Sequence, residues 1–255
     1  MIVVTAGFPN RFSRELLVFA NFDSESAGQH IREGSCNYGE VENINRCLRR
    51  REDKQNFLII GDSFSAHLRF GLSRVFPDMH FANAWSGGCN PSRRLDHARA
   101  CNALRTFLFD DLIPKKTFDG IIIAASWSAD EIEPLLDVLE HLKDFNSRIY
   151  VVGQPVRYIG ALPQLLAEAM RFGDAGLLER HRRLEEGKVL DIAFREAVEK
   201  TGVATYISNL EVLCPRDQCR TVAPDGAPIQ FDFGHLTKSG SVFVARGWKD
   251  GELFP

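Results

Sequence analysis

Two segments far apart in the sequence carry the side chains that an activated serine nucleophile requires. A Gly-Asp-Ser tripeptide ending at Ser63 follows an apolar run at residues 57–60 and precedes a stretch of helical periodicity, so Ser63 is expected at a strand-to-helix turn. Asp232 precedes His235 by three residues and can orient its ring. A serine becomes reactive when a base accepts its proton and a third group fixes the tautomer of that base. These residues predict acyl transfer or ester hydrolysis, with Ser63, His235 and Asp232 as the catalytic residues.

The same residues also have a purely structural interpretation. Gly-Asp-Ser is common in turns, where the serine can cap a helix, and Asp232 can be an ordinary turn residue. The other histidines have no comparable partner nearby in the sequence, and His67, one helical turn beyond Ser63, is expected to pack in the interior. These other histidines are His30, His67, His80, His97, His141 and His181.

The elements that must position these residues alternate along the chain. Strands are predicted at residues 57–60, 79–84, 120–125, 148–152 and 203–207, and helices at 41–51, 66–76, 96–112, 129–142, 162–170, 177–201 and 236–245. Continuous apolar strands separated by helices are typical of a parallel sheet covered on both faces. The predicted fold class is therefore α/β, a three-layer α/β/α sandwich with a central parallel sheet of about five strands.

Polar and glycine-rich loops follow the predicted strands. Ser63 follows the first strand, Gly88 lies in the loop after the second, Trp127 follows the third and Gln154 follows the fourth. The carboxyl ends of parallel strands meet at one edge of the sheet, where ligands bind. The topology alone therefore predicts that these loops lie together.

Gly88 is the candidate partner of Ser63 in an oxyanion hole. A glycine lets its backbone N–H approach a developing negative charge without a side chain in the way. The N–H of Ser63 would be the second donor. The alternative is that residues 87–88 form a flexible turn next to Cys89, and both descriptions can hold at once.

The N-terminal part of the chain has a different character. Residues 5–39 carry Gly, Asn and Ser without sustained periodicity, which indicates an extended lead-in. We therefore predict an N-terminal extension or linker at residues 1–54, packing on a catalytic domain at residues 55–255.

The composition is that of a globular protein with a full core. The chain has 255 residues, 44% of them hydrophobic and 25% charged, with a net charge of −3 and a pI of about 6.2. This charge gives no reason to expect nucleic acid as a partner. No apolar run is long enough to span a bilayer, and residues 1–4 are too short for the core of a signal peptide, so any export signal is expected outside this chain.

Six cysteines favour an oxidising compartment over six reduced, buried thiols. They follow one another as three local pairs, and of the fifteen possible connectivities we predict Cys36–Cys47, Cys89–Cys101 and Cys214–Cys219. None has the C-x-x-C spacing of a zinc site, and the histidines are not clustered with them. We expect no metal and no cofactor.

Several blocks of the sequence resemble those of a known superfamily. They are GDSFSAHL at 61–68, GCNP at 88–91, IAASW at 123–127, the segment from Leu213 to Cys219, and DFGHLT at 232–237, with the Cys36 and Cys47 pair ahead of them. With these blocks the chain resembles the SGNH (GDSL-type) hydrolase superfamily. More narrowly, it resembles the periplasmic SGNH domain fused to membrane acyltransferase-3 proteins that O-acetylate bacterial surface polysaccharides and lipopolysaccharide.

The resemblance implies a flavodoxin-like SGNH fold and a function. Ser63 would be the nucleophile, His235 the base, Asp232 its orienting group, and Gly88 part of the oxyanion hole. The activity would be O-acyl transfer, with an acetyl group the expected one, from an acyl donor to a glycan acceptor in surface polysaccharide or lipopolysaccharide. The domain would be periplasmic and tethered to the inner membrane by a transmembrane acyltransferase region outside this chain.

One block departs from the superfamily pattern. Ser126, Trp127 and Ser128 stand where the superfamily has an asparagine that donates to the oxyanion, so the hole would have two backbone donors or borrow one from Asn83 or Asn90. Trp127 is predicted to offer a ring face to a sugar, together with Asn90, unless it is a core residue. Two further functions remain open, namely a carbohydrate acetylesterase and a glycan-binding module that has lost catalysis.

Overall fold

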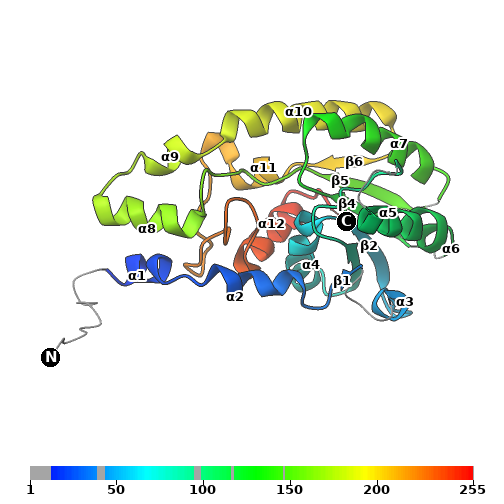
Figure 1. Cartoon of the computed structure of the whole chain (residues 1–255), viewed down its shortest axis with the longest axis horizontal. Helices are drawn as coiled ribbons and strands as arrows, with labels where there is room; N and C mark the ends of the chain where they lie inside the picture. Colours follow the sequence, from blue (N-terminus) through cyan, green and yellow to red (C-terminus); the bar gives the residue numbers. More distant parts are fainter. Residues whose placement is uncertain (1–12, 39–43, 95–98, 116–117, 146, 255) are drawn as a thin grey trace.

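A six-stranded, all-parallel sheet forms the centre of the molecule in the computed structural model (Figure 1). The structure describes residues 13–38, 44–94, 99–115, 118–145 and 147–254. The strands are β1 (Cys36–Asn37), β2 (Gln55–Gly61), β3 (Met79–Trp85), β4 (Gly120–Ala124), β5 (Arg148–Val152) and β6 (Thr205–Ile207). Their order across the sheet is β1-β3-β2-β4-β5-β6, so β2, which leads to Ser63, lies near the middle.

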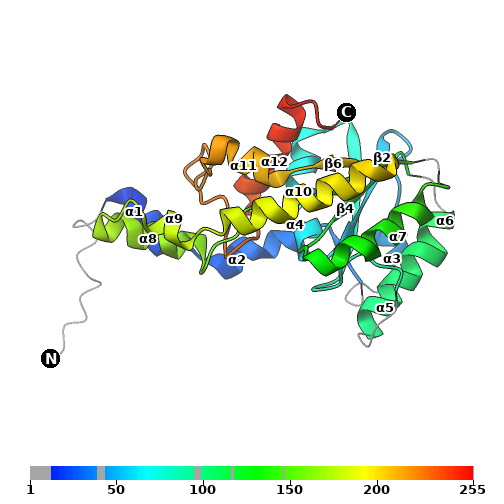
Figure 2. The same cartoon turned by 90° about the horizontal axis from the view of Figure 1, so that it is seen from above.

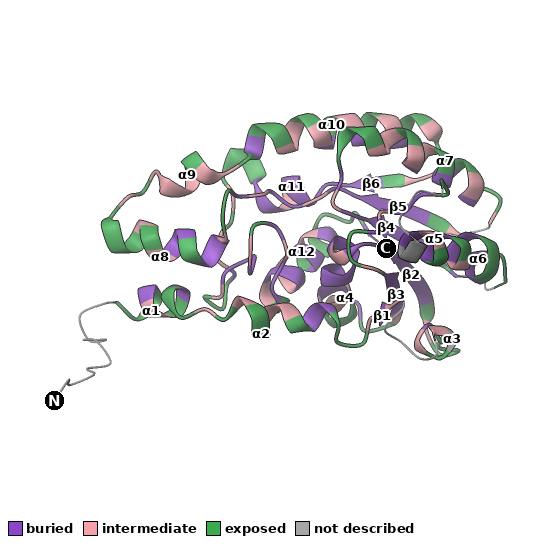
Figure 3. Cartoon of the chain, viewed as in Figure 1, coloured by how far each residue is buried: buried purple, intermediate pink, exposed green. Residues whose placement is uncertain are grey.

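Helices cover both faces of this sheet because its central strands are apolar on both sides. Phe57 and Ile59 of β2 belong to one core cluster, whereas Leu58 and Ile60 belong to the other. Successive side chains of a strand point to opposite faces, so a continuous apolar run needs two covering layers. The α/β/α sandwich predicted from the sequence is confirmed, and the burial of its central layer is visible in Figure 3.

The first face is covered by helices that include the one beginning at Ser63 and the one beginning three residues after His235. Residues of α4 (Ser63–Val75), α8 (Leu162–Phe172), α11 (Asn209–Leu213) and α12 (Lys238–Asp250) contribute to this core. The opposite face is covered by α5 (Arg99–Thr106), the π-helical segment η3 (Phe107–Leu112), α6 (Ile113–Lys115), α7 (Ile132–Leu142) and part of α10 (Leu184–Thr201). Four short elements lie in the connections after β1, namely α3 (Ile44–Cys47), η4 (Ala129–Glu131), α9 (Leu177–His181) and η5 (Pro215–Asp217).

The prediction of an extended lead-in is wrong for the described residues before β2. They form α1 (Arg14–Ala20), α2 (Ser24–Gly28), η2 (Gln29–Ile31) and β1, and β1 adds a sixth strand by pairing with β3. Side chains of Ser13 and Asp23 cap the two α-helices, and α1 packs on α8 (Figure 2). Helices this short have little stability alone and depend on packing. The division of the chain at residue 54 stays a prediction.

Several predicted helices have different bounds in the structure, and two of the differences have a clear local cause. The helix expected at 177–201 is interrupted, because Arg182 is extended and forms an isolated β-bridge with Tyr158. The last helix begins at Lys238 rather than 236, because the hydroxyl of Thr237 caps it by accepting from the N–H of Gly240. The start expected for the helix at 96–112 lies outside the described residues.

Three disulfides are present, with the connectivity expected from the sequence. They join Cys36 to Cys47, Cys89 to Cys101, and Cys214 to Cys219. The first links β1 to α3, and the second links the loop after β3 to α5, so both constrain segments at the edges of the sheet.

Candidate active site

The turn that carries Ser63 has a backbone that requires glycine. Gly61 ends β2 with a φ of +147°, and a Cβ atom there would lie 1.8 Å from the carbonyl oxygen of Ala124. Asp62 follows as the N-cap of α4, with its Oδ1 accepting from the N–H of Phe64 at 2.7 Å. Ser63 is therefore the first residue of α4, where a helix has N–H groups without intrahelical acceptors.

The structure brings Ser63, His235 and Asp232 together in one hydrogen-bonded chain. The Oγ of Ser63 lies 2.7 Å from Nε2 of His235, and Nδ1 of His235 lies 2.8 Å from Oδ2 of Asp232. An ionised carboxylate only accepts hydrogen bonds, so Nδ1 carries the proton and Nε2 accepts from Ser63. This is the tautomer that a general base needs.

Backbone hydrogen bonds fix the Asp232 carboxylate. Its Oδ1 accepts from the N–H of Gly234 at 2.9 Å and from that of His235 at 2.8 Å. Burial alone would raise the pKa of Asp232, but the hydrogen bond and charge of His235, together with these two N–H groups, outweigh burial and lower the pKa. The carboxylate is therefore ionised at neutral pH and oriented toward the ring.

The packing of α12 on α4 sets the distance between the serine and the histidine. The N–H of Gly71 on α4 donates to Oγ of Ser241 on α12 at 2.8 Å, and a Cβ on Gly71 would lie 2.0 Å from the carbonyl oxygen of Ser241. One turn earlier in α4, His67 is buried and its Nδ1 accepts from the N–H of Leu236 at 3.3 Å. The two helices thus hold residue 235 beside residue 63.

Aromatic rings enclose the imidazole of His235. The Phe231 ring stacks on it with an interplanar angle of 14°, and the centroid of the Phe64 ring lies 4.4 Å away. The side chain of His235 is only 14% exposed. The N-terminal segment supports this packing, since the hydroxyl of Ser24 donates to the carbonyl of Phe231 at 2.7 Å and the His30 ring contacts Phe231 edge-on. The sequence pattern gave no sign of this contact.

The loop that contains Gly88 begins at the same edge of the sheet as the turn at Ser63. In the sheet register, Gly61 pairs with Trp85 on β3 and with Ala124 on β4, so the loops after these three strands leave the sheet side by side. Gly88 is exposed and has a φ of +68°. Its backbone N–H thus lies in a loop at the edge that carries Ser63, and its role in an oxyanion hole stays a prediction.

The two asparagines considered as extra oxyanion donors have other partners. Asn83 is fully buried and its Nδ2 donates to the carbonyl of Ile59 and to Oγ of Ser65, both at 3.1 Å. Asn90 donates a long hydrogen bond of 3.4 Å to the carbonyl of Ser126. Asn90 therefore lies at the same edge as Ser63, whereas Asn83 is inside the sheet.

Trp127 does not present the free ring face predicted for sugar binding. It is 3% exposed, packs against Phe194 with ring centroids 5.0 Å apart, and donates from Nε1 to the carbonyl of Val152 at 2.8 Å. A buried indole whose N–H is satisfied is a packing residue. The ring thus packs in the core beside the strand end, and the part predicted for Trp127 in sugar binding stays a prediction.

Sequence reasoning missed Arg157, which lies across the rim of the site. Its guanidinium lies over the Phe64 ring at 5.2 Å and over the Phe233 ring at 5.9 Å, and Nη2 donates to Oγ of Ser126. The backbone N–H of Ser126 donates to Oδ2 of Asp62 at 3.0 Å. The one available signal was position, because Arg157 belongs to the loop after the fourth predicted strand.

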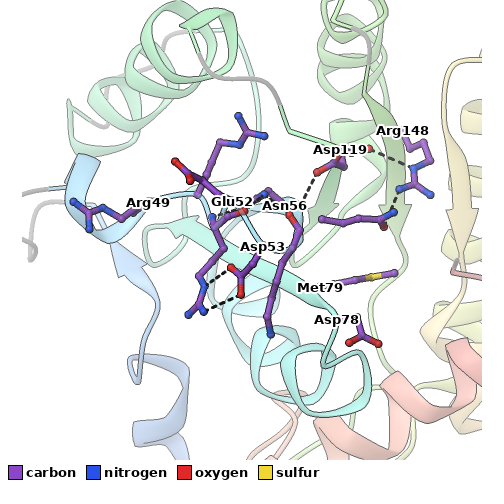
Figure 4. Close-up of a pocket in the computed structure, with 12 residues that line it drawn as sticks. Arg49, Glu52, Asp53, Asn56, Asp78, Met79, Asp119 and Arg148 are labelled. Carbon is purple, nitrogen blue, oxygen red and sulfur yellow. Dashed lines mark hydrogen bonds and ion pairs between the residues drawn. The ribbon is translucent and has the colours of Figure 1, made fainter.

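A cavity of about 1130 Å³ lies at the opposite end of the sheet (Figure 4). Its walls come from the amino ends of the strands and from the segment before β2, including Gln55, Met79 and Arg148. Protein groups satisfy many of its polar atoms. Arg51 pairs with Asp53, and the backbone N–H of Asn56 donates to Asp119 at 2.6 Å. Its size alone does not make it the reactive site.

The described residues contain no helix with both the length and the hydropathy needed to cross a bilayer.

Among solved structures, the periplasmic domain of a lipopolysaccharide acetyltransferase from Salmonella serovar Paratyphi A matches with a TM-score of 0.77 and 22% identity, covering 92% of this chain and 99% of that one.

Two more distant matches have TM-scores of 0.48. One is a variant of an acetyl-xylooligosaccharide esterase from Geobacillus stearothermophilus, with 14% identity and coverage of 81% of this chain and 98% of that one. The other is a putative acylhydrolase from Bacteroides fragilis, with 10% identity and coverage of 81% and 91%. No curated protein matches the sequence significantly.

The family model described as "SGNH domain (fused to AT3 domains)" matches residues 28–250. This match includes the sheet, the disulfides and the Ser63 and His235 turns. The fold of the Salmonella domain agrees with it. The chain therefore belongs to the family of SGNH domains that occur fused to AT3 domains.

Proposed function

We propose that this domain transfers an acyl group, expected to be acetyl, to a hydroxyl of a bacterial surface glycan through a covalent acyl-serine at Ser63. The observation that carries the proposal is the hydrogen-bonded chain from Ser63 through His235 to Asp232 at the carboxyl edge of the sheet. Family membership and fold support acyl-transfer or hydrolytic chemistry.

In the first half-reaction the Ser63 oxygen attacks the acyl carbonyl carbon of the donor. Nε2 of His235 accepts the hydroxyl proton as the new C–O bond forms, and Asp232 stabilises the imidazolium. Negative charge develops on the carbonyl oxygen, where the N–H groups of Ser63 and Gly88 would donate to it. The intermediate then expels the donor's leaving group, which takes the proton from His235, and an acyl-serine remains.

In the second half-reaction a sugar hydroxyl takes the place of the leaving group. His235 accepts the proton of this hydroxyl as its oxygen attacks the acyl carbon. The bond to Ser63 then breaks, and the serine recovers its proton from His235. The net reaction moves one acyl group from the donor to the sugar hydroxyl, and no atom changes its oxidation state.

The acceptor and the location follow from the family rather than from the site. The family model names domains fused to AT3 domains, and the Salmonella match is the periplasmic domain of a lipopolysaccharide acetyltransferase. We propose that this chain acts in the periplasm on lipopolysaccharide or another surface polysaccharide. A transmembrane acyltransferase region outside this chain would deliver the acyl group and tether the domain to the inner membrane. The three disulfides are typical of an oxidising compartment.

The test is covalent capture of the acyl-serine. The protein is incubated with 4-nitrophenyl acetate, quenched in acid and digested, and the peptide containing Ser63 is examined for an acetyl adduct by mass spectrometry. The Ser63→Ala variant should lose the adduct, and its release of nitrophenol should fall by about 10⁴-fold or more. Ser73→Ala, on the exposed side of the same helix, is the matched control and should behave as wild type. Unchanged turnover in Ser63→Ala would refute the proposal.

A carbohydrate acetylesterase would use the same first half-reaction with water as the acceptor. Two solvent-accessible side chains favour this second function. Asp232 is 28% exposed and the adjacent Phe233 is 42% exposed, so water reaches the rim of the site. Partition of a preformed acetyl-serine between water and a glycan distinguishes the two. Discharge onto the glycan at the expense of acetate supports the transferase, whereas release of acetate alone supports the esterase.

A further inference from the structure

Arg157 is a half-buried cation that lacks an ion-pair partner in the described part of the chain. Within the described ranges, its hydrogen-bond acceptor is Oγ of Ser126, and its Nε is buried without a partner. The charges of Asp62 and Glu131 act on Arg157, but neither carboxylate forms an ion pair with it in the described part of the chain. Asp62 accepts instead from two backbone N–H groups, and Glu131 accepts from the N–H of Ser128 at 2.7 Å. Burying a guanidinium without a counter-ion is unfavourable, so such a group indicates a function that uses the charge.

This arginine lies between the triad and a cavity of about 330 Å³. On one side it contacts Phe64, whose ring also contacts His235. On the other side it lines the cavity, which lies beyond the carboxyl ends of β4 and β5 and against the start of α10. The other lining residues are Trp127, Gln154, Pro155, Arg183, Glu186, Gly187 and Leu190. The volume is near the lower end of the about 300–1,000 Å³ usual for ligand sites.

The lining of this cavity combines apolar and polar groups and carries excess positive charge. Two arginines face one carboxylate, Glu186, which is exposed and pairs with Arg183. The Oε1 of Gln154 is buried without a hydrogen-bond partner. A site with a guanidinium that has no ion-pair partner among the described residues, and with an unsatisfied amide oxygen, is suited to a ligand that has both an anionic group and hydroxyl donors.

We infer that this cavity is the acceptor subsite and binds a sugar residue that bears a carboxylate or a phosphate, with Arg157 as the partner of its anionic group. The inference rests on the proposed function, since it places the acceptor beside Ser63. The cavity suits the acceptor better than the acetyl group, because a space of about 330 Å³ exceeds what an acetyl group needs and Arg157 separates it from the triad. Gln154 would accept from a hydroxyl of the sugar.

The experiment measures binding in the Ser63→Ala protein, so its result does not depend on catalysis. Methyl glucuronide, glucose 6-phosphate and methyl glucoside are titrated separately, with affinities taken from calorimetry or from chemical-shift changes. Either anionic sugar should bind about tenfold or more tightly than the neutral glucoside, because a charged hydrogen bond is added to a common ring. A preference for glucuronide or for phosphate identifies which anionic group the site prefers.

A second set of variants assigns the preference to Arg157. Arg157→Met, in the Ser63→Ala background, should bind all three sugars alike, and Arg157→Lys should keep part of the preference because the charge remains without the planar fork. Arg148→Met is the matched control, because Arg148 also lies over a phenylalanine ring, that of Phe57, but at the opposite end of the sheet. It should retain the full preference.

Two outcomes would overturn the inference. One is equal affinity for the neutral and anionic sugars in the parent protein, including no binding of either, and the other is an anionic preference that survives in Arg157→Met. Thermal unfolding of each variant verifies folding, and Arg157→Lys serves as the test if the methionine variant is unfolded. Neither outcome affects the proposed function, which fails separately if Ser63 forms no acetyl adduct.

Discussion

Replacing Asp232 with asparagine tests whether the orientation of His235 is what makes Ser63 reactive. Asp232 accepts three hydrogen bonds, from Nδ1 of His235 and from the backbone N–H groups of Gly234 and His235. In Asp232→Asn, Oδ1 can keep both backbone bonds. The new Nδ2 is a donor that faces Nδ1 of His235, so the ring must place its proton on Nε2. Nε2 can then no longer accept from Ser63.

The structure predicts a large effect on rate and a small one on stability. The wrong tautomer should lower the rate of Ser63 acetylation by about 10⁴-fold, the size of the effect in another serine enzyme with this arrangement. Stability should fall by no more than about 1.5–3 kcal/mol, the usual value of one hydrogen bond to a charged group, and by less here because Asp232 is partly exposed. Asp232→Ala removes all three acceptors and should be less stable than Asp232→Asn.

The assay pairs the burst of nitrophenol from 4-nitrophenyl acetate with denaturant unfolding of the same samples. Asp225→Asn is a suitable control, since Asp225 is an exposed turn residue ahead of α12. Loss of activity in Asp232→Asn in proportion to unfolded protein would point to a structural role. Retention of more than a tenth of the wild-type rate by a folded Asp232→Asn protein would refute the reasoning.

Two further predictions concern the elements behind the triad. Gly71→Ala should force α12 away from α4, because the new Cβ would lie 2.0 Å from the carbonyl of Ser241. It should destabilise the protein by about 1–3 kcal/mol and slow acetylation in the remaining folded protein, and an unchanged melting temperature would contradict it. Acidification should destabilise the fold through His67. Burial, followed by the nearby charges of His235 and His30, lowers its pKa well below 6.5. Below about pH 6.5 the unfolded chain therefore binds a proton that the folded state does not. The fall in melting temperature from pH 7.5 to 5 should be smaller in His67→Gln, measured relative to its own value at pH 7.5, and an equal fall would count against this role.

The interior strands could be predicted because an interior parallel strand is apolar on both sides, whereas β6, also predicted, lies at the edge of the sheet. Residues 57–60 and 148–152 show this as continuous runs, and their bounds agree with β2 and β5 within a few residues. The prediction that the loops after these strands lie at one edge followed from the parallel arrangement of the strands. By contrast, α1 and α2 are too short to give a periodic signal and exist because α8 and the loop at Phe231 cover them.

The burial and contacts of individual side chains at the edge of the sheet could not be predicted from the sequence in this way. Trp127 and Arg157 both follow strands, but only Trp127 was predicted to face a ligand. The structure buries Trp127 against Phe194 of α10, whereas it places Arg157 across Ser126 and Phe64. Each outcome depends on residues more than 25 positions away, and no local pattern records those contacts.

The sequence by itself determined the class of fold, the pairing of the cysteines as neighbours, and the residue types from which a serine nucleophile and its base could be built. Apolar periodicity, cysteine order and motif spacing are local properties, so they can be observed in the sequence without knowledge of the fold. Only the tertiary structure decided that Ser63 and His235, 172 positions apart, lie 2.7 Å from each other. That distance is set by the close crossing of α4 and α12 at Gly71, where backbone meets backbone without an intervening side chain.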